Sequence, residues 1–198
     1  LIEDPLFFGD RQYPMRFHKQ KLWLHRSSMA RYAVRLQDNG WPTAIIKYKF
    51  GYPVLKTSIE GLAAEGTTSI LVSDPVDFSL NKRLEAYTEN NGLELELLPT
   101  PLFLNTSLQN RLWRRDQKRW FMAEFYKYQR RRLNVLMDGD EPMGGRWSFD
   151  EDNRKKVPKK LHDQVPRLCP LPSVDKIDLE ARNSVNTDFP ENYGALEK

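Results

Sequence analysis

The sequence contains a single cysteine, Cys169, among its 198 residues, so the chain cannot form an internal disulfide. It has no CxxC pair and no His/Cys cluster, and we therefore predict no metal site. One unpaired thiol fits a reducing compartment, which predicts a cytoplasmic protein. No run of about 18 apolar residues and no signal-peptide pattern occurs, which argues against a membrane span or export.

Glycine-rich phosphate loops are also missing. Neither GxGxxG nor GxxxxGK[ST] occurs, so the sequence does not support a nucleotide site that cradles phosphates. The histidines His18, His25 and His162 lie in basic surroundings and suggest no Ser/His/Asp set. We predict no catalytic residue in this chain.

Basic charge is present, but it is unevenly distributed. The net charge is +4, and most of the Lys and Arg excess falls in residues 111–160. Tryptophan and tyrosine alternate with these cations. A local basic surface is the usual footprint of a polyanionic partner such as a nucleic acid.

The first hundred residues alternate strand-like and helix-like patterns. We expect strands at 1–3, 43–49, 67–75 and 93–99, and helices at 18–37, from Thr57 or Ser58 to 65, and at 81–90. The continuous apolar run in 67–75 is typical of a buried parallel strand. This order predicts an α/β fold with a doubly wound, Rossmann-like or flavodoxin-like, mostly parallel sheet and helices on both faces.

Two of these strands end alike, in "EDP" and "SDP". Ligands of parallel sheets bind beyond the carboxyl ends of the strands. This position makes five residues candidates to bind a polar heterocycle or ribityl hydroxyls: Glu3, Asp4, Ser73, Asp74 and Pro75. The alternative is that each Asp-Pro pair only caps a turn.

After Pro101 the pattern changes to two helices, expected at 107–120 and 121–137. The cations Arg130, Arg131 and Arg132 lie near the end of the second helix, where they complement its dipole. They form either a solvated basic face or a contact to DNA phosphates. Prolines then space an extended segment, followed by a helix at 173–185. We therefore divide the chain into 1–105, a helical extension at 106–143, and an inter-domain linker with one helix at 144–198.

The stretch "GGRWSFDEDNRKK", residues 144–156, precedes the proline-spaced segment. Gly144 and Gly145 allow the chain to turn. We expect Trp147 and Phe149 to insert as anchors, with Asp150, Asn153 and Arg154 holding the turn. The stretch is thus interpreted as a clasp between the first domain and whatever follows it.

Three stretches carry a family resemblance: "RFHKQKLWLHRSSMARYAVRL" (16–36), "FMAEFYKYQRRRLNVLMDGDEPMGGRWSFDEDNRKKVPK" (121–159) and "FPENYGALE" (189–197). Together they resemble the deoxyribodipyrimidine photolyase-related family, the prokaryotic iron–sulphur photolyases and cryptochromes that include bacterial six-four photolyases. The resemblance implies an N-terminal antenna domain that lacks its first strand, joined to the inter-domain linker. The chain, which opens "LIEDPLFFGD", is then expected to be a piece of a larger protein, without its helical FAD domain.

The resemblance also implies cofactors. In such proteins an antenna pigment such as a ribityl-lumazine lies at the strand ends and passes its excitation to FAD, and the parent also carries a 4Fe-4S cluster. The matching segments here are 2–7 and 73–78, with His25 on the pocket helix. Leu6 and Phe7 replace an expected acid, and His25 replaces a smaller residue. We therefore expect no tightly bound pigment in this chain.

The implied function is an antenna and scaffold role in a flavoprotein that repairs DNA photoproducts with light or senses blue light. Its partners would be damaged DNA and the missing FAD domain, with no membrane partner. Two alternatives stay open from the residues themselves. One is a free-standing α/β module that binds a small ligand, and the other is a nucleic-acid-binding module without enzymatic activity.

Overall fold

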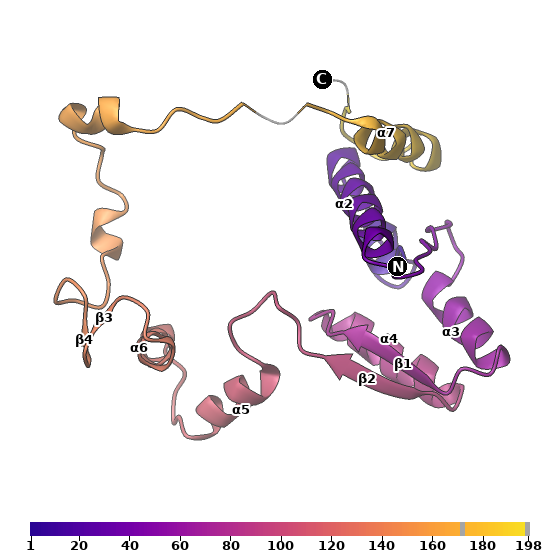
Figure 1. Ribbon diagram of the computed structural model, residues 1–198, viewed down its shortest axis with the longest axis horizontal. Coiled ribbons are helices and arrows are strands. Elements are labelled where there is room, and N and C mark those ends of the chain that lie inside the picture. The colour runs from indigo at the N-terminus through magenta and orange to yellow at the C-terminus, as the bar shows by residue number, and fades with distance from the viewer. Residues whose placement is uncertain (171–172, 197–198) are drawn as a thin grey trace. The chain divides into compact units, whose positions relative to one another are not determined.

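The computed structural model describes residues 1–170 and 173–196, and Figure 1 shows its helices and strands. The described residues form two compact units. The first unit comprises Leu1–Pro101 with residues 173–196, and the second comprises residues 102–170. The last helix belongs to the first unit. The predicted division into 1–105, 106–143 and 144–198 stays a prediction.

Two helices form one half of the first unit. Helix α2 (Lys19–Asp38) confirms the helix predicted at 18–37, and α7 (Lys176–Asp188) confirms the one predicted near 173–185. The two pack side by side (Figure 1). They share a core with the short helix α1 (Pro5–Phe8), in which the side chains of Leu22 and Val185 are fully buried.

The other half is a small parallel sheet with two helices. Strand β1 (Ser69–Ser73) pairs with β2 (Glu94–Leu98), with Ser69 opposite Glu94, as the predicted parallel order requires. Helices α3 (Val54–Ala64) and α4 (Phe78–Asn90) contribute Leu55, Ile59 and Leu84 to the core beneath this pair. The first unit is therefore a mixed α/β structure with a parallel sheet.

The sheet is smaller than predicted. Within the described residues, the segments expected as strands at 1–3 and 43–49 share one isolated parallel bridge, between Ile2 and Ile46. The expected burial of β1 on both faces is wrong, since Ile70 and Val72 pack on the core while Leu71 is 58% exposed. A continuous doubly wound sheet thus stays a prediction.

Two helices of the first unit begin earlier than predicted. Thr57 and Ser58 do not cap α3, because their hydroxyls donate to the carbonyls of Pro53 and Val54 from inside the helix. This is the bond that Ser and Thr make four residues into a helix. Helix α4 begins at Phe78 because the side chain of Asp77 accepts from the Leu80 amide at 2.8 Å.

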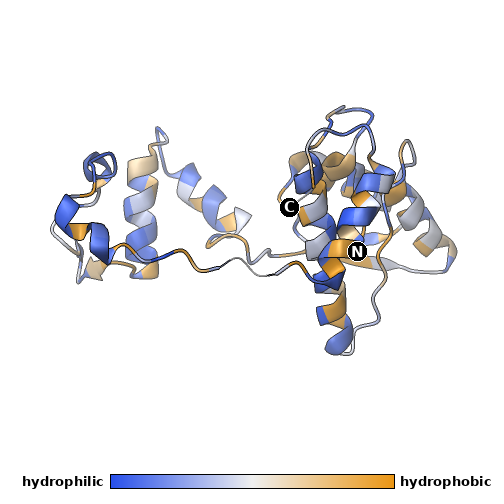
Figure 2. Cartoon of the chain, turned by 90° about the horizontal axis from the view of Figure 1, so that it is seen from above, coloured by the Kyte–Doolittle hydropathy of each residue, from blue (hydrophilic) through white to orange (hydrophobic). Residues whose placement is uncertain are grey.

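The second unit is built from short elements. It contains α5 (Ser107–Arg115), α6 (Met122–Leu133), a hairpin of β3 (Met137–Asp138) and β4 (Glu141–Pro142), and the short 3₁₀ turns Asp150–Asp152 and Lys159–Gln164. Both helices end before their predicted limits. The ring of Trp113 lies 4.8 Å from that of Phe125, which joins the helices. Figure 2 shows hydrophilic and hydrophobic residues mixed along the helices of the chain.

Within residues 1–170 and 173–196, no helix is long and apolar enough to cross a bilayer. No group of three His, Cys, Asp or Glu side chains is placed there to hold a metal ion. Cys169 is exposed.

Candidate functional site

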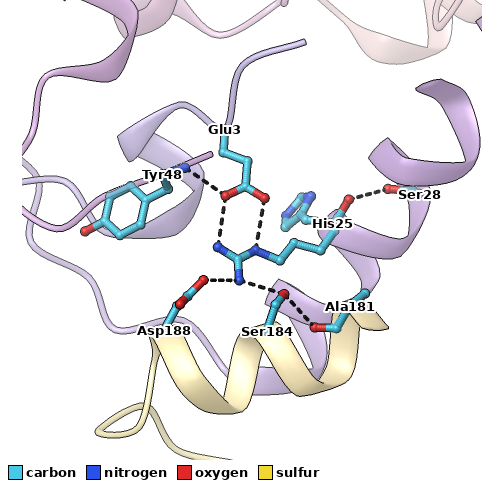
Figure 3. Close-up of polar contacts among 8 residues, drawn as sticks. Glu3, His25, Ser28, Tyr48, Ala181, Ser184 and Asp188 are labelled. Atoms are coloured by element: carbon cyan, nitrogen blue, oxygen red, sulfur yellow. Dashed lines mark hydrogen bonds and ion pairs between the residues drawn. The ribbon is translucent and has the colours of Figure 1, made fainter. Parts of the chain in front are cut away.

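A buried ion pair fixes the N-terminal segment in the first unit. Both carboxylate oxygens of Glu3 accept from the guanidinium of Arg26, at 2.9 and 3.0 Å (Figure 3). One of these oxygens also accepts from the Tyr48 amide at 2.8 Å. The Glu3 carboxylate thus holds α2 and the chain around Tyr48, and its predicted role in binding a ligand stays a prediction.

Arg26 continues this network into the last helix. Its guanidinium donates to Ser184 at 2.9 Å and to the Asp188 carboxylate at 2.6 Å, both on α7 (Figure 3). The residues thus tied together are far apart in the sequence. The network sets the position of the residue that follows Glu3, which is Asp4.

Asp4 has one oxygen with a partner and one without. Its Oδ1 accepts from the Leu6 amide at 2.9 Å and caps α1. Its Oδ2 is buried and has no hydrogen-bond partner among the described residues. Burial raises the pKa of the Asp4 carboxyl, although Arg83 acts in the opposite direction. A buried acceptor without a partner is costly, because burial removes its hydrogen bonds to water.

Asp4 lines a cavity of about 330 Å³, here called the Asp4 pocket. Its polar wall contains Asp10 and Arg83, joined by contacts of 2.6 and 3.1 Å. The hydrogen bond from Arg83 lowers the pKa of the Asp10 carboxyl. Its aromatic wall is made of Tyr48, Tyr52 and Tyr87. Carboxylates, a guanidinium and aromatic rings suit a planar ligand that carries hydroxyl or N–H groups.

His25 lies outside the lining of this pocket. Its ring is 6.2 Å from that of Phe7 and 5.9 Å from that of Phe8. Burial is the main cause that lowers the pKa of His25, so the neutral form is favoured. Its Nε2 is buried without a hydrogen-bond partner among the described residues. The structure therefore places His25 in an aromatic cluster beside the pocket-forming segment.

The second strand-end group is also separate from the Asp4 pocket. Asp74 accepts from the Val76 amide at 2.8 Å and from the Asn81 side chain at 3.3 Å. Ser73 and Pro75 flank this turn and are not among the residues that line the pocket. The contacts of Asp74 match the interpretation of this stretch as a turn. Of the six predicted pigment-binding residues, the pocket includes Asp4.

Sequence reasoning missed Asp10 and Arg83. Asp10 accepts from the amides of Gln12 and Tyr13 in an irregular loop, and Arg83 reaches it from α4. The two are separated by 73 positions. The only local signal was an acid in "FFGD", directly after a glycine.

These geometries can be compared with known proteins. The family model of the deoxyribodipyrimidine photo-lyase-related proteins matches residues 1–198. The chain belongs to this family. Among individual relatives, the (6-4) photolyase of Agrobacterium fabrum is 28% identical over 187 residues, which is 91% of this chain and 36% of the photolyase. "Uncharacterized protein R852" of Acanthamoeba polyphaga mimivirus is 29% identical over 166 residues, covering 81% of this chain and 83% of the viral protein.

In this photolyase-related chain, two of the three candidate DNA-contact arginines are engaged by other groups of the second unit. Arg130 is 6% exposed and donates to the carbonyls of Val135, Leu136 and Trp147. Arg132 donates to the Leu104 carbonyl and the Asn105 side chain at 3.1 and 3.0 Å. Arg131 is exposed, with its guanidinium 4.6 Å from the centre of the Trp147 ring. Their contact with DNA stays a prediction, for which Arg131 is the most accessible of the three.

Proposed function

We propose that this chain acts as the antenna-chromophore and scaffold part of a photolyase- or cryptochrome-like flavoprotein. Such a protein repairs photoproducts in damaged DNA with light or senses blue light. FAD and a 4Fe-4S cluster would then be held by another part of that protein, and this chain would supply no catalytic residue. Membership of the photolyase-related family and the similarity to the Agrobacterium (6-4) photolyase support the proposal.

The observation that supports the antenna role is the buried, unpartnered Oδ2 of Asp4, a residue that lines the Asp4 pocket. A ribityl hydroxyl or a ring N–H that donates to this oxygen would supply the hydrogen bond that the protein does not. The tyrosine walls offer surfaces on which a flat heterocycle stacks. Arg83 already binds Asp10, so it would orient that acid toward the ligand as well as contact the ligand itself.

The finer fold prediction belongs to the same proposal. A doubly wound sheet would place the carboxyl ends of its strands beside the Asp4 pocket, where ligands of such folds bind. The β1–β2 pair and the Ile2–Ile46 bridge are both parallel, as that arrangement requires. Because residues expected in the antenna site are replaced at Leu6, Phe7 and His25, we propose weak, exchangeable binding of a ribityl-lumazine rather than a resident pigment.

Titration of the purified chain with a ribityl-lumazine, followed by the anisotropy of the ligand's own fluorescence, tests this function. Asp4→Ala should weaken binding by at least about tenfold, because a hydrogen bond to a charged group contributes roughly 1.5–3 kcal/mol. Asp74→Ala is the matched control, since this acid also follows a strand but lies outside the pocket.

Acidification gives an independent readout. A ligand that donates to Asp4 needs the ionised carboxylate, so affinity should fall as Asp4 takes up its proton. Because its pKa is raised, this loss should occur above the usual pH range of an aspartate. Circular dichroism of Asp4→Ala would show that the variant is folded. Equal affinities for Asp4→Ala, Asp74→Ala and the unchanged chain would refute the assignment of the pocket.

A further inference from the structure

The C-terminal half of α5 and the turn that follows it carry exposed basic charge that the protein does not neutralise. Arg111 and Arg114 on α5, and Lys118 and Arg119 in the turn, are exposed and make no ion pair within the described part of the chain. The acid in this stretch, Asp116, binds Arg115 at 3.0 Å. By contrast, Arg146 and Lys155 in the following loop are paired with Glu151 and Asp152. The charge of the turn is therefore available to a partner.

The same turn presents an aromatic ring to solvent. Trp120 is 59% exposed, and the guanidinium of Arg114 lies 3.4 Å from the centre of its ring. Trp113, on α5, is instead packed against Phe125 and Tyr128. The contact with Arg114 holds the Trp120 ring in place by a cation–π interaction and leaves much of the ring accessible.

We propose that this surface, the Trp120 turn (Arg111, Arg114, Lys118, Arg119 and Trp120), binds single-stranded nucleic acid independently of any photoproduct. Proteins that bind single strands without regard to sequence combine an aromatic ring, on which a base stacks, with cations that follow the phosphates. Both parts are present in the short span from Arg111 to Trp120. A duplex keeps its bases stacked on one another, so an isolated exposed tryptophan is better matched to an unpaired base.

The charge distribution favours a polyanion over an apolar protein partner. An apolar docking partner would leave four unpaired cations at the edge of its interface, whereas phosphates neutralise them and release counterions. The Trp120 turn lies in the second unit and the Asp4 pocket lies in the first. The inference therefore stands apart from the antenna function and does not depend on Arg130, which is buried.

Fluorescence anisotropy with the full chain and a labelled oligo(dT) of about 15 nucleotides tests the inference, since single-strand sites span up to about 16 nucleotides. Trp120→Ala should weaken binding by about tenfold, and Trp120→Phe should restore much of the loss because an aromatic face is retained. Trp41→Ala is the matched control, since Trp41 is also an exposed tryptophan, at 67%, but lies in the first unit.

Salt dependence tests the cations. Between about 50 and 200 mM salt, Lys118→Gln with Arg119→Gln should reduce the slope of log affinity on log salt by about 0.7 for each phosphate that is no longer neutralised. Lys47→Gln with Lys49→Gln removes the same charge from the first unit and should leave the slope nearly unchanged. Oligo(rU) and a DNA duplex of equal length serve as further probes.

Binding of oligo(dT) or oligo(rU) that is tighter than binding of the duplex, and that is weakened in Trp120→Ala but not in Trp41→Ala, would support the proposal. The proposal is overturned if the single strands do not bind at low salt. It is equally overturned if Trp120→Ala and Trp41→Ala behave alike, or if the duplex binds more tightly than both single strands.

Discussion

Each unit of this photolyase-related chain buries one arginine among its described residues, and the two arginines are held by different partners. Arg26 in the first unit is 4% exposed and is bound by the carboxylates of Glu3 and Asp188. Arg130 in the second unit is 6% exposed and is surrounded by carbonyl oxygens, with its guanidinium 5.2 Å from the centre of the Trp147 ring. The positive charge of Arg26 is neutralised by carboxylates, whereas that of Arg130 is stabilised by carbonyl dipoles and by the face of the Trp147 ring.

The two units also differ in how much apolar surface they bury. Apart from Pro142, the buried apolar side chains of the described residues belong to the first unit, where Leu22, Val54 and Val185 are nearly inaccessible. In the second unit even Trp120 and Met122 are mostly exposed. Burial of apolar surface is the main favourable term in folding. We therefore expect the first unit to unfold cooperatively and the second to open locally at a lower free-energy cost.

The largest expected effect comes from Arg26→Met. It leaves Glu3 buried without its countercharge, so we expect the free energy of unfolding of the first unit to fall by about 3–5 kcal/mol. Urea denaturation followed by circular dichroism measures this loss. The control is Arg31→Met, which removes an exposed pair with Asp175 and Asp178 and should change little.

A double variant shows whether charge or packing causes that loss. Adding Glu3→Leu to Arg26→Met removes the stranded carboxylate, so much of the stability should return. A double variant as unstable as Arg26→Met would mean that the arginine acts by filling space rather than by neutralising Glu3.

A smaller and more local effect is expected from Trp147→Ala. The substitution removes the ring that faces both Arg130 and Arg131, and each cation–π contact contributes about 0.5–1 kcal/mol at partly exposed sites. Hydrogen exchange should accelerate by up to about tenfold at the Val135 and Met143 amides, whose bonds close the loop beside Arg130.

The control for this experiment is Trp120→Ala, which leaves that loop untouched because the Trp120 ring faces Arg114. Unchanged exchange at both amides in Trp147→Ala would contradict the role of Trp147 as an anchor. Trp147 contacts Arg130 and Arg131 of α6, so its observed anchoring contacts lie within the second unit. The expected clasp between the first domain and a following part of the protein stays a prediction.

Helices with a strong local signal could be predicted from the sequence, whereas the site could be predicted only in part. The apolar period and the Asn39–Gly40 end gave α2 to within one residue. The strand-like segment at 43–49 lacked a continuous neighbour to accept its hydrogen bonds, so β propensity alone did not make it a strand. Sheet formation depends on a partner that a local pattern does not reveal.

The same limit applies to the pocket. Glu3 and Asp4 were predicted together because both follow a strand-like segment. Successive side chains of an extended segment point in opposite directions. Glu3 therefore forms an ion pair with Arg26, while Asp4 lines the pocket. Arg83 reaches the site through the packing of α4, and no pattern within either segment pairs it with Asp10.

The smallest of these effects is expected from Asp10→Asn, and it depends on pH. Arg83 lowers the pKa of the Asp10 carboxyl below its unfolded value, so this pair stabilises the fold wherever the unfolded aspartate is ionised. At neutral pH the variant should lose about 1 kcal/mol, since the asparagine still offers an oxygen to Arg83. As the pH falls below about 4, through the usual pKa and then the lowered one, the unchanged chain should lose this advantage and the two stabilities should converge. Thermal unfolding of both proteins between about pH 3 and 7 measures the difference.

A difference in stability that stays constant across this pH range would show that Asp10 acts through its bonds to the Gln12 and Tyr13 amides rather than through its charge. In that case the Asp10–Arg83 ion pair would contribute as little to stability as the exposed ion pairs of the chain. It would then differ from the buried pair between Arg26 and Glu3, whose charge we expect to matter.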